Sequence, residues 1–300
     1  MAKTVSQVFG MENIGHSELG KVAAVLEVPS TNVITSDQML GIEVEVENYD
    51  AVGKVDSVWR AHGDGSLRNG GTEFVTQPIK ACDAPKALQN LLKDFLSPNC
   101  CFSPRTSVHV HFNMLPYSVD VVKNITMLYA CFEPLFFRFT GRGRAKNIYC
   151  IPIVETSTLH HFERYALRDV AGRWSKYTSL NLLPLTTQGT IEARHMHGTF
   201  DVQKLCIWIR LWCKLIEYCL KNEVTTVRKL IAGMELETDY QQLLNQIFGD
   251  DAVHLKYRDW MDIEASVTTV KTAYTNIDTQ SRVLAERDLE KGAYFTFKAK

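Results

Sequence analysis

Apolar and charged residues alternate strictly in the segment GIEVEVEN, which spans residues 41–48. A period of two is typical of a β-strand, whose successive side chains point to opposite faces. The alternation therefore places Ile42, Val44 and Val46 on one face and three glutamates on the other. The segment SVHVHFN at residues 107–113 alternates in the same way, so its two histidines share one face of a second strand.

Three more regions have strand patterns. Residues 55–79 are expected to form a strand, a turn and a returning strand, because glycines surround Asp64 and the β-prone run EFVT starts at Glu73. Another strand is expected from Thr190 to about His195. The segment IYCIPIV at 148–154 is also strand-like.

Helices are predicted between these groups of strands. A short helix is expected at 17–28, a second at 85–96 and a long one at 118–139. Asp201 can cap a second long helix, whose Trp and Leu residues recur at helical spacing and form a stripe that faces the core. The last part of the chain, 222–300, is predicted to be mainly helical.

The predicted strands come as hairpins and meanders, and regular alternation of single strands and helices is missing. This order favours an α+β fold, in which an antiparallel sheet packs against long helices. No linker rich in proline, glycine or serine divides the chain. We therefore expect an N-terminal segment at 1–40, a central domain at 41–221 and a helical extension of that domain at 222–300.

Composition and charge exclude several classes of protein. Hydrophobic residues make up 45% of the chain, which is enough for a sizeable core. The 33 basic and 34 acidic residues give a formal net charge of −1, so nucleic-acid binding is not indicated. No apolar run approaches the roughly 20 residues that a membrane span needs. The eight cysteines lack C-x-x-C spacing, so we expect a soluble, cytoplasmic protein with reduced and mostly buried thiols.

Acidic side chains gather on the predicted strands and at their edges. Three carboxylates on one strand face repel one another, unless the face is solvated or binds cations. For this strand alone, both interpretations stand. Further carboxylates and two histidines on other strands favour a shared cation site, because such donors suit Mg²⁺ or Mn²⁺. The residues concerned are Glu43, Glu45, Glu47, Asp64, Glu73, His109, His111 and Glu192.

Several carboxylates around more than one divalent ion suit the chemistry of nucleoside triphosphates. The ions would neutralise the charge that develops as a phosphoryl group moves. Arg194 follows Glu192 by two positions and so shares its strand face. Its planar guanidinium could bind a phosphate or a substrate carboxylate with two hydrogen bonds.

Five motifs in order resemble the amidoligase family. They are GIEVEVE, WRAHGDGSL with EFVTQP, SVHVHFN, KYTSLNL and TIEARHMHGTFD, and together they span roughly residues 40–220. The family is similar to glutamate–cysteine ligase and more distantly to glutamine synthetase. The resemblance implies a glutamine synthetase-like funnel of antiparallel strands whose acidic inner face binds ATP and two or three Mg²⁺ or Mn²⁺ ions. The implied reaction joins a carboxylate to an amine through an acyl phosphate.

The resemblance also implies roles for residues at matching positions. The implied catalytic residues are Arg194, Arg144 and Glu45, the implied ATP contacts are Arg194, Arg144, Tyr177 and Asn181, and the implied metal ligands are Glu43, Glu45, Asp64, Glu73, His109 and Glu192. One of the two histidines on the 107–113 strand is expected to face the site, and His109 is preferred over His111. The central domain at 41–221 then corresponds to the catalytic domain.

Some of these residues have simpler explanations. An aspartate in a glycine-rich turn often accepts hydrogen bonds from its own backbone, as Asp64 could. Arg142 and Arg144 could be solvated loop charges. Outside the site, we expect Glu47 to be a peripheral partner, His197 to be structural or exposed, and His160 and His161 to lie on a solvated surface.

Three functions are compatible with the sequence. An ATP-dependent carboxylate–amine ligase that acts on small-molecule or peptide substrates is predicted. A non-catalytic structural or binding protein with the ligase fold is the alternative. A kinase with the same metals but no amine acceptor is less favoured, because no Walker or protein-kinase motif is present. The sequence leaves the substrates and the oligomeric state open.

Overall fold

The strands of the computed structural model form one sheet. The structure describes residues 2–12, 18–25, 27–50, 52–96, 100–156, 159 and 165–272. Within them the strands are β1 Met39–Val46, β2 Gly53–Lys54, β3 Trp59–Gly63, β4 Thr72–Thr76, β5 Ile79–Lys80, β6 Ser107–Asn113, β7 Leu180–Asn181 and β8 Thr190–His197. The predicted strands at 41–48, 107–113 and 190–195 and the predicted strand pair within 55–79 are confirmed.

The order of the sheet is β2-β3-β4-β1-β6-β8-β7, and β5 pairs with β1. All of these pairs are antiparallel. The predicted strand at 148–154 is wrong: only Ile151 makes an isolated bridge, to Thr178, and Ile153–Glu155 form a 3-10 turn. Pro152 explains the difference, because it has no N–H to donate to a neighbouring strand.

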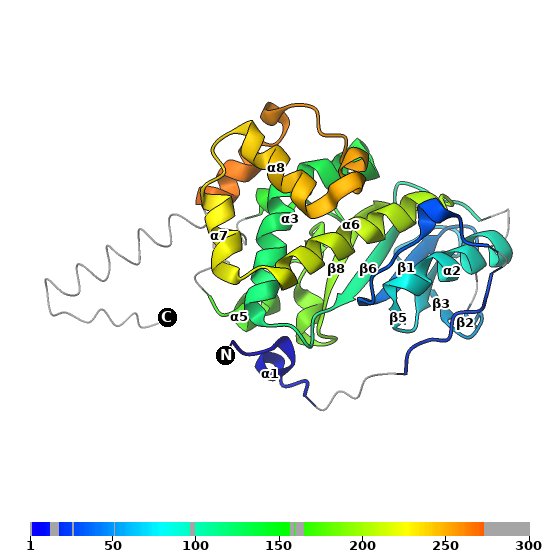
Figure 1. Cartoon of the computed structure of the whole chain (residues 1–300). Coiled ribbons are helices and arrows are strands. Elements are labelled where there is room, and N and C mark those ends of the chain that lie inside the picture. Colours follow the sequence, from blue (N-terminus) through cyan, green and yellow to red (C-terminus); the bar gives the residue numbers. More distant parts are fainter. Residues whose placement is uncertain are drawn as a thin grey trace, which may run out of the picture.

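Helices pack around the sheet (Figure 1). They are α1 Val5–Phe9, α2 Ala84–Gln89, α3 Val119–Thr140, α5 Leu167–Gly172, α6 Val202–Lys221, α7 Val224–Ala232 and α8 Glu237–Phe248. Residues 264–272 are also helical, and a π-helical turn at Asn90–Phe95 extends α2. The Asp201 carboxylate accepts the Lys204 N–H at the start of α6, which confirms the predicted cap. The expected α+β class is therefore confirmed.

The short helix predicted at 17–28 is wrong. Within this range, residues 18–25, 27 and 28 contain no helix. The segment instead lies along the sheet: Gly20 N–H donates to Pro78 O at 2.8 Å, and Ser57 Oγ donates to Lys21 O at 2.8 Å. These tertiary hydrogen bonds outweigh a helix propensity that its three valines already weaken.

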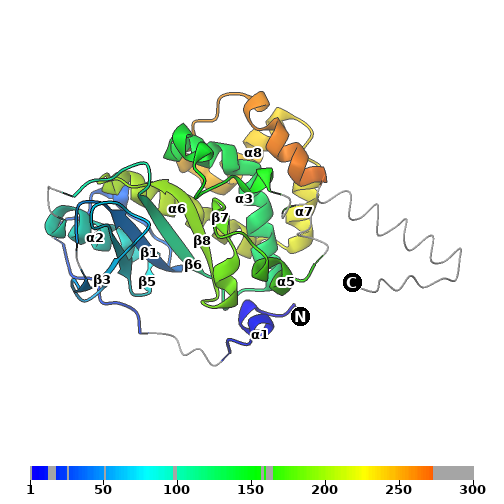
Figure 2. The same ribbon diagram turned by 180° about the vertical axis from the view of Figure 1, so that it is seen from behind.

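The two faces of the sheet differ in character. On one face, Phe112 of β6 packs against Trp212 of α6, with 5.8 Å between ring centroids, and Trp208 donates to His195 of β8. Figure 1 shows α6 crossing this face, and Figure 2, from behind, shows β1, β6 and β8 in front of it. Because side chains alternate along a strand, His109 points to the opposite face of the sheet. That face carries the polar residues described below.

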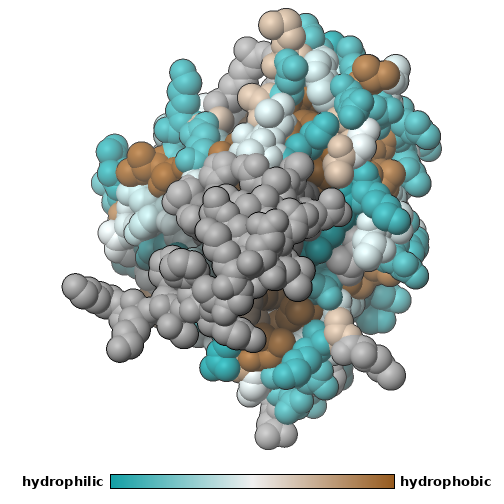
Figure 3. Space-filling view, turned by 90° about the vertical axis from the view of Figure 1, so that its left-hand side faces the viewer, coloured by the Kyte–Doolittle hydropathy of each residue, from teal (hydrophilic) through white to brown (hydrophobic). Residues whose placement is uncertain are grey.

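The helices after α6 pack onto α3. Tyr240 of α8 donates to Cys131 O at 3.2 Å, and the rings of Phe132 and Phe248 lie 5.4 Å apart. These residues belong to the same hydrophobic core as the sheet. On the face toward α7, the visible residues are mainly hydrophilic and surround small hydrophobic areas (Figure 3). The helical prediction is thus confirmed up to residue 272, and residues 273–300 lie outside the described part.

Glu133 is a buried carboxylate in the middle of α3. It accepts hydrogen bonds from the N–H groups of Ile153 and Val154, at 2.8 and 3.2 Å, and from the hydroxyl of Ser179. Burial raises the pKa of Glu133 to about 7, although these donors favour the charged form. The side chain therefore ties α3 to two loops while holding its proton to near-neutral pH.

This raised pKa predicts a pH-dependent stability. An unfolded glutamate loses its proton near pH 4.5, whereas native Glu133 keeps it until about pH 7. The stabilisation is therefore complete below pH 4.5 and is lost as the pH rises through 7. We expect the free energy of unfolding of the wild type, relative to Glu133→Gln, to fall by about 2–3 kcal/mol between pH 5 and 8. Urea unfolding of both proteins measures this, and parallel pH profiles would contradict it.

Candidate metal-binding and active site

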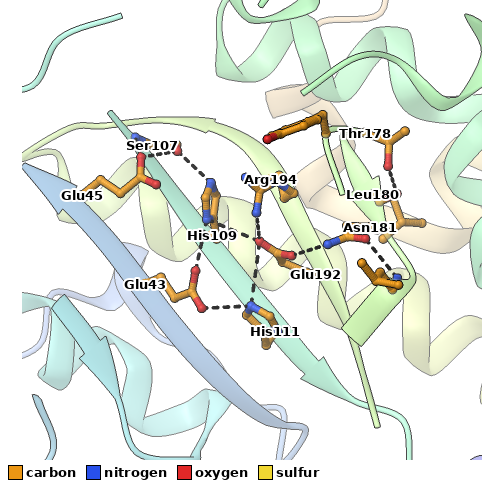
Figure 4. A network of polar contacts seen from close by, with 12 residues as sticks. Glu43, Glu45, Ser107, His109, His111, Thr178, Leu180, Asn181, Glu192 and Arg194 are labelled. Atoms are coloured by element: carbon orange, nitrogen blue, oxygen red, sulfur yellow. Dashed lines mark hydrogen bonds and ion pairs between the residues drawn. The ribbon is translucent and has the colours of Figure 1, made fainter. Parts of the chain in front are cut away.

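Four neighbouring strands bring the acidic and histidine residues together. The strand register places three pairs directly opposite one another, and these are Glu43 with His109, Glu45 with Glu73, and His111 with Glu192. The side chains come from β4, β1, β6 and β8 and lie on the sheet face away from α6. Figure 4 shows those of β1, β6 and β8 pointing toward one another. The alternation seen in the sequence thus produces one cluster.

Glu43 is at the centre of this cluster. Its Oε2 lies 3.2 Å from His109 Nδ1, and its Oε1 lies 3.1 Å from His111 Nε2. Burial alone would raise the pKa of Glu43, but the two histidines outweigh it and hold the pKa well below its usual range. Burial likewise opposes the charged form of His111, yet the carboxylates of Glu43 and Glu192 raise its pKa. Both histidines therefore face the site, whereas one was expected.

Two groups of three side chains among the described residues have donor atoms close enough to hold a metal ion. They are Glu43, Glu73 and His109, and Glu43, His111 and Glu192, and within each group the atoms lie within 4.8 Å of one another. An ion with ligand distances near 2.1 Å holds its ligand atoms up to about 4.2 Å apart. Small side-chain rotations would therefore close either group around an ion. Oxygen-rich sets with one imidazole suit Mg²⁺ or Mn²⁺.

The carboxylates of the cluster repel one another. Burial, together with the charges of Glu43, Glu45 and Asp64, raises the pKa of Glu73 to about 8. The group therefore keeps a proton near neutral pH in the absence of cations. A divalent cation would relieve the repulsion and replace this proton.

Glu192 is fixed from two sides. Arg194 Nη1 forms an ion pair with its Oε1, and Asn181 Nδ2 donates to its Oε2 at 2.7 Å. Asn181 reaches this position because β7 pairs with β8, with Asn181 opposite Glu192. Asn181 is thus hydrogen-bonded to a candidate metal ligand, Glu192.

Ser107 holds two members of the cluster. Its N–H and its hydroxyl both donate to Glu45 Oε2, at 2.8 and 2.6 Å, and its Oγ lies 2.7 Å from His109 Nε2. Glu45 belongs to neither three-residue group, and Ser107 keeps it beside His109. Ser107 is therefore a residue that positions the cluster.

Removing this hydroxyl should loosen the cluster without unfolding the protein. For Ser107→Ala we expect the affinity for Mn²⁺ to fall about tenfold, because groups that orient metal ligands contribute to binding in this range. Electron paramagnetic resonance measures the concentration of free Mn²⁺ during a titration, and the affinity follows from it. Ser107→Thr keeps the hydroxyl and should restore most of the loss. Equal affinity of wild type and Ser107→Ala would contradict this role.

Most of the cluster forms the floor of a cavity of about 270 Å³, but His111 and Glu192 do not line it. The lining residues are Glu43, Glu45, Asp64, Ser66, Glu73, Arg105, Ser107, His109, Tyr149, Lys176, Tyr177 and Arg194. Asp64 lies on the turn between β3 and β4, where its carboxylate accepts hydrogen bonds from Ser66 N–H and Oγ. Tyr177 lies at the exposed rim, with 40% of its surface accessible. Of the predicted site residues, only Glu192, Arg144 and Asn181 do not line this cavity.

Arg144 has a different place from the expected one. It is only 6% exposed, and its guanidinium donates to the carbonyl oxygens of His195 and Arg194, at 3.3 and 3.1 Å. Burial lowers its pKa. These contacts hold the backbone of β8 next to Arg194, so in this structure Arg144 supports the strand and does not line the cavity.

Several lining residues had no sequence prediction. Arg105, Tyr149 and Lys176 lie on loops, where hydrophobic periodicity gives no signal. Glu47 lies outside both groups, accepts a hydrogen bond from Arg68 N–H at 3.0 Å, and is peripheral as expected. His160, His161 and the side chain of Arg142 lie outside the described residues.

Residues 2–216 match the model of a protein family described as "putative amidoligase enzyme". The chain belongs to this amidoligase family. The family match supports a ligase activity in general terms, and the matched part includes every residue that lines the cavity. A comparison with curated proteins found no match. No helix in the described part of this family member is long and apolar enough to cross a membrane.

Proposed function

We propose that the protein is an ATP-dependent carboxylate–amine ligase that forms an amide bond through an acyl phosphate. The observation that carries this proposal is the position of Glu43, which lines a cavity and is shared by two groups of metal-type donor atoms in a chain that belongs to the amidoligase family. We also propose that the sheet is a glutamine synthetase-like funnel, that residues 41–221 are its catalytic domain, and that the protein acts in the cytoplasm.

The proposed metal ligands are Glu43, Glu73, His109, His111 and Glu192, with Glu45 and Asp64 beside them. Bound Mg²⁺ or Mn²⁺ would neutralise the phosphate charge of ATP and orient the γ-phosphate. Asn181 and Ser107 hold Glu192 and Glu45 in position by hydrogen bonds.

The other steps use side chains of the cavity. The substrate carboxylate attacks the γ-phosphate, the bond to the β-phosphate breaks and ADP leaves, and Arg194 stabilises the developing charge through its guanidinium. The amine must lose a proton before it displaces phosphate. Glu45 is the proposed acceptor, since it lines the cavity and its hydrogen bonds within the described residues all involve Oε2, which leaves Oε1 to accept a proton. The rim residue Tyr177 would help to shield the acyl phosphate from water.

One set of distances favours a second candidate, an acyl transferase with Ser107 as nucleophile. Ser107 Oγ, His109 and Glu43 are linked by 2.7 and 3.2 Å contacts, as in a serine–histidine–carboxylate triad. However, the hydroxyl also donates to Glu45 at 2.6 Å, so its proton is already bound by a carboxylate. The ligase is therefore favoured, and labelling of Ser107 by a fluorophosphonate would support the transferase instead.

Ligand-induced stabilisation tests the main proposal. Mn²⁺ together with a non-hydrolysable ATP analogue should raise the melting temperature, because a ligand at 100 times its Kd stabilises the native state by about 2.7 kcal/mol. ATP supplied with pooled amino acids and peptides should then give phosphate and a product that has lost one water, detected by mass spectrometry. No thermal shift at millimolar ligand would favour a non-catalytic protein, and a stable phosphorylated product would indicate a kinase.

A further inference from the structure

Besides Arg194, two exposed cations line the cavity whose floor carries the carboxylates. Arg105 lies on the loop before β6, and Lys176 lies on the loop before β7. Both are exposed residues of the cavity wall. The acidic residues that line the same cavity are Glu43, Glu45, Asp64 and Glu73. The cavity therefore combines an acidic floor with basic groups at its mouth.

The position of Arg105 is fixed by the turn that carries Asp64. Its Nη1 donates to Ser66 O at 3.0 Å, so the guanidinium is held to a backbone carbonyl and keeps its remaining donors. The adjacent Pro104 O accepts a hydrogen bond from Asn147 Nδ2, at 3.0 Å. This bond joins the Arg105 loop to the segment that carries Tyr149 on the cavity wall.

Lys176 is held on the neighbouring wall by aromatic residues. Its Nζ lies 5.0 Å from the centre of the Tyr177 ring, within the range of a cation–π contact. The Tyr177 ring packs edge-on against Tyr149, with 5.8 Å between centroids. The backbone of this loop is in turn fixed by Ile151 N–H, which donates to Tyr177 O at 2.8 Å.

Neither cation is neutralised by a carboxylate of the described residues. No ion pair of Arg105 or Lys176 is found there, although four carboxylates line the same cavity. Those carboxylates are engaged elsewhere: Glu43 with the histidines, Glu45 with Ser107, and Asp64 with its own turn. The two positive charges are therefore available to a ligand.

We propose that Arg105 and Lys176 form an oxyanion subsite at the mouth of the cavity, which binds a carboxylate or phosphate of a molecule that also reaches the metal-binding floor. This inference rests on the proposed function and deepens it. The group could be a phosphate of the nucleotide or a second carboxylate of the acceptor substrate. A substrate without a second anionic group would leave the subsite free for the nucleotide.

The test uses the full chain with neutral variants of similar length. Arg105→Gln, Lys176→Gln and the double variant are compared with Arg68→Gln and Lys146→Gln, which are exposed residues that do not line the cavity. Four titrations are made at low salt: Mn²⁺ alone, Mn²⁺ with a non-hydrolysable ATP analogue, Mn²⁺ with glutarate, and pyrophosphate without metal. Circular dichroism confirms that every variant is folded.

We expect a loss of oxyanion affinity of a few-fold in each single variant and about tenfold in the double variant, because each partly exposed charge contributes modestly. The affinity for Mn²⁺ alone and both control variants should stay within about twofold of the wild type. Weaker binding of the ATP analogue identifies the nucleotide as the source of the oxyanion, and weaker binding of glutarate identifies the substrate carboxylate. Either result supports the subsite.

Unchanged affinity of the double variant for the ATP analogue, glutarate and pyrophosphate would overturn the subsite. A wild type that binds no Mn²⁺ would overturn the metal part of the proposed function instead. In that case the pyrophosphate titration still decides the subsite: weaker binding by the double variant supports it, while equal binding, or no binding to the wild type, overturns it.

Discussion

Replacing Glu43 with glutamine will abolish metal-dependent ATP turnover while the protein remains folded. Glu43 is shared by both groups of donor atoms, so its loss removes a ligand from each. Metal ions supply several kcal/mol of charge stabilisation, and each 1.36 kcal/mol corresponds to a tenfold change in rate. We therefore expect the rate of ATP turnover to fall about a thousandfold or more. Phosphate release with Mn²⁺ measures the rate, and titration of Mn²⁺ measures the lost binding.

The matched control is Glu47→Gln. Glu47 extends the same alternating series from β1 but belongs to neither group, and its Oε1 accepts a hydrogen bond from Arg68 N–H. Glutamine keeps that acceptor, so turnover and Mn²⁺ affinity should stay close to those of the wild type. Full activity of Glu43→Gln, or equal losses in the two variants, would refute the central role of Glu43.

Arg194→Ala should produce the second largest loss. Arg194 is the arginine of the cavity that is paired with a candidate metal ligand, Glu192, so its removal leaves phosphate charge without a cation at that position. We expect kcat to fall about 100- to 1,000-fold, which is typical when one donor to a developing negative charge is lost. Mn²⁺ affinity should not fall, because Glu192 is released from its ion pair.

Two further variants make this prediction specific. Arg194→Lys keeps the charge without the planar fork and should recover only part of kcat. Arg60→Ala removes an exposed arginine of β3 that does not line the cavity, and kcat should be unchanged. If Arg194→Ala lowers Mn²⁺ affinity as much as kcat, Arg194 supports the metal cluster and does not act on phosphate.

The polar face of the sheet could be predicted because it follows from a period of two. Alternation alone placed Glu43 and His109 on the polar faces of their strands. Burial of Val44 against the core keeps the neighbouring Glu43 on the polar face. The alternation could not show which strands are neighbours. That adjacency makes Glu43 contact both histidines, so the preference for His109 over His111 was too narrow.

Loops explain most of what the sequence did not predict. Arg105 and Lys176 lie on irregular segments, whose position depends on single tertiary hydrogen bonds such as that between Arg105 and Ser66. Arg144 was expected to contact a substrate carboxylate or phosphate because the resemblance to the amidoligase family implied that role. In the structure it donates to the backbone of β8, and a sequence does not distinguish a solvated arginine from one that is buried against carbonyl oxygens.

Because β1 lies in the middle of the sheet, it is expected to open far less readily than the loops of the cavity wall. β1 is bonded to β4 on one side and β6 on the other, whereas Arg105 and Lys176 lie on loops. Amide protons in the middle of a sheet exchange only through large-scale opening, while loops open at little cost. In the proposed ligase, substrates would therefore enter and products leave by fluctuations of these loops, without disturbing the strand that carries Glu43.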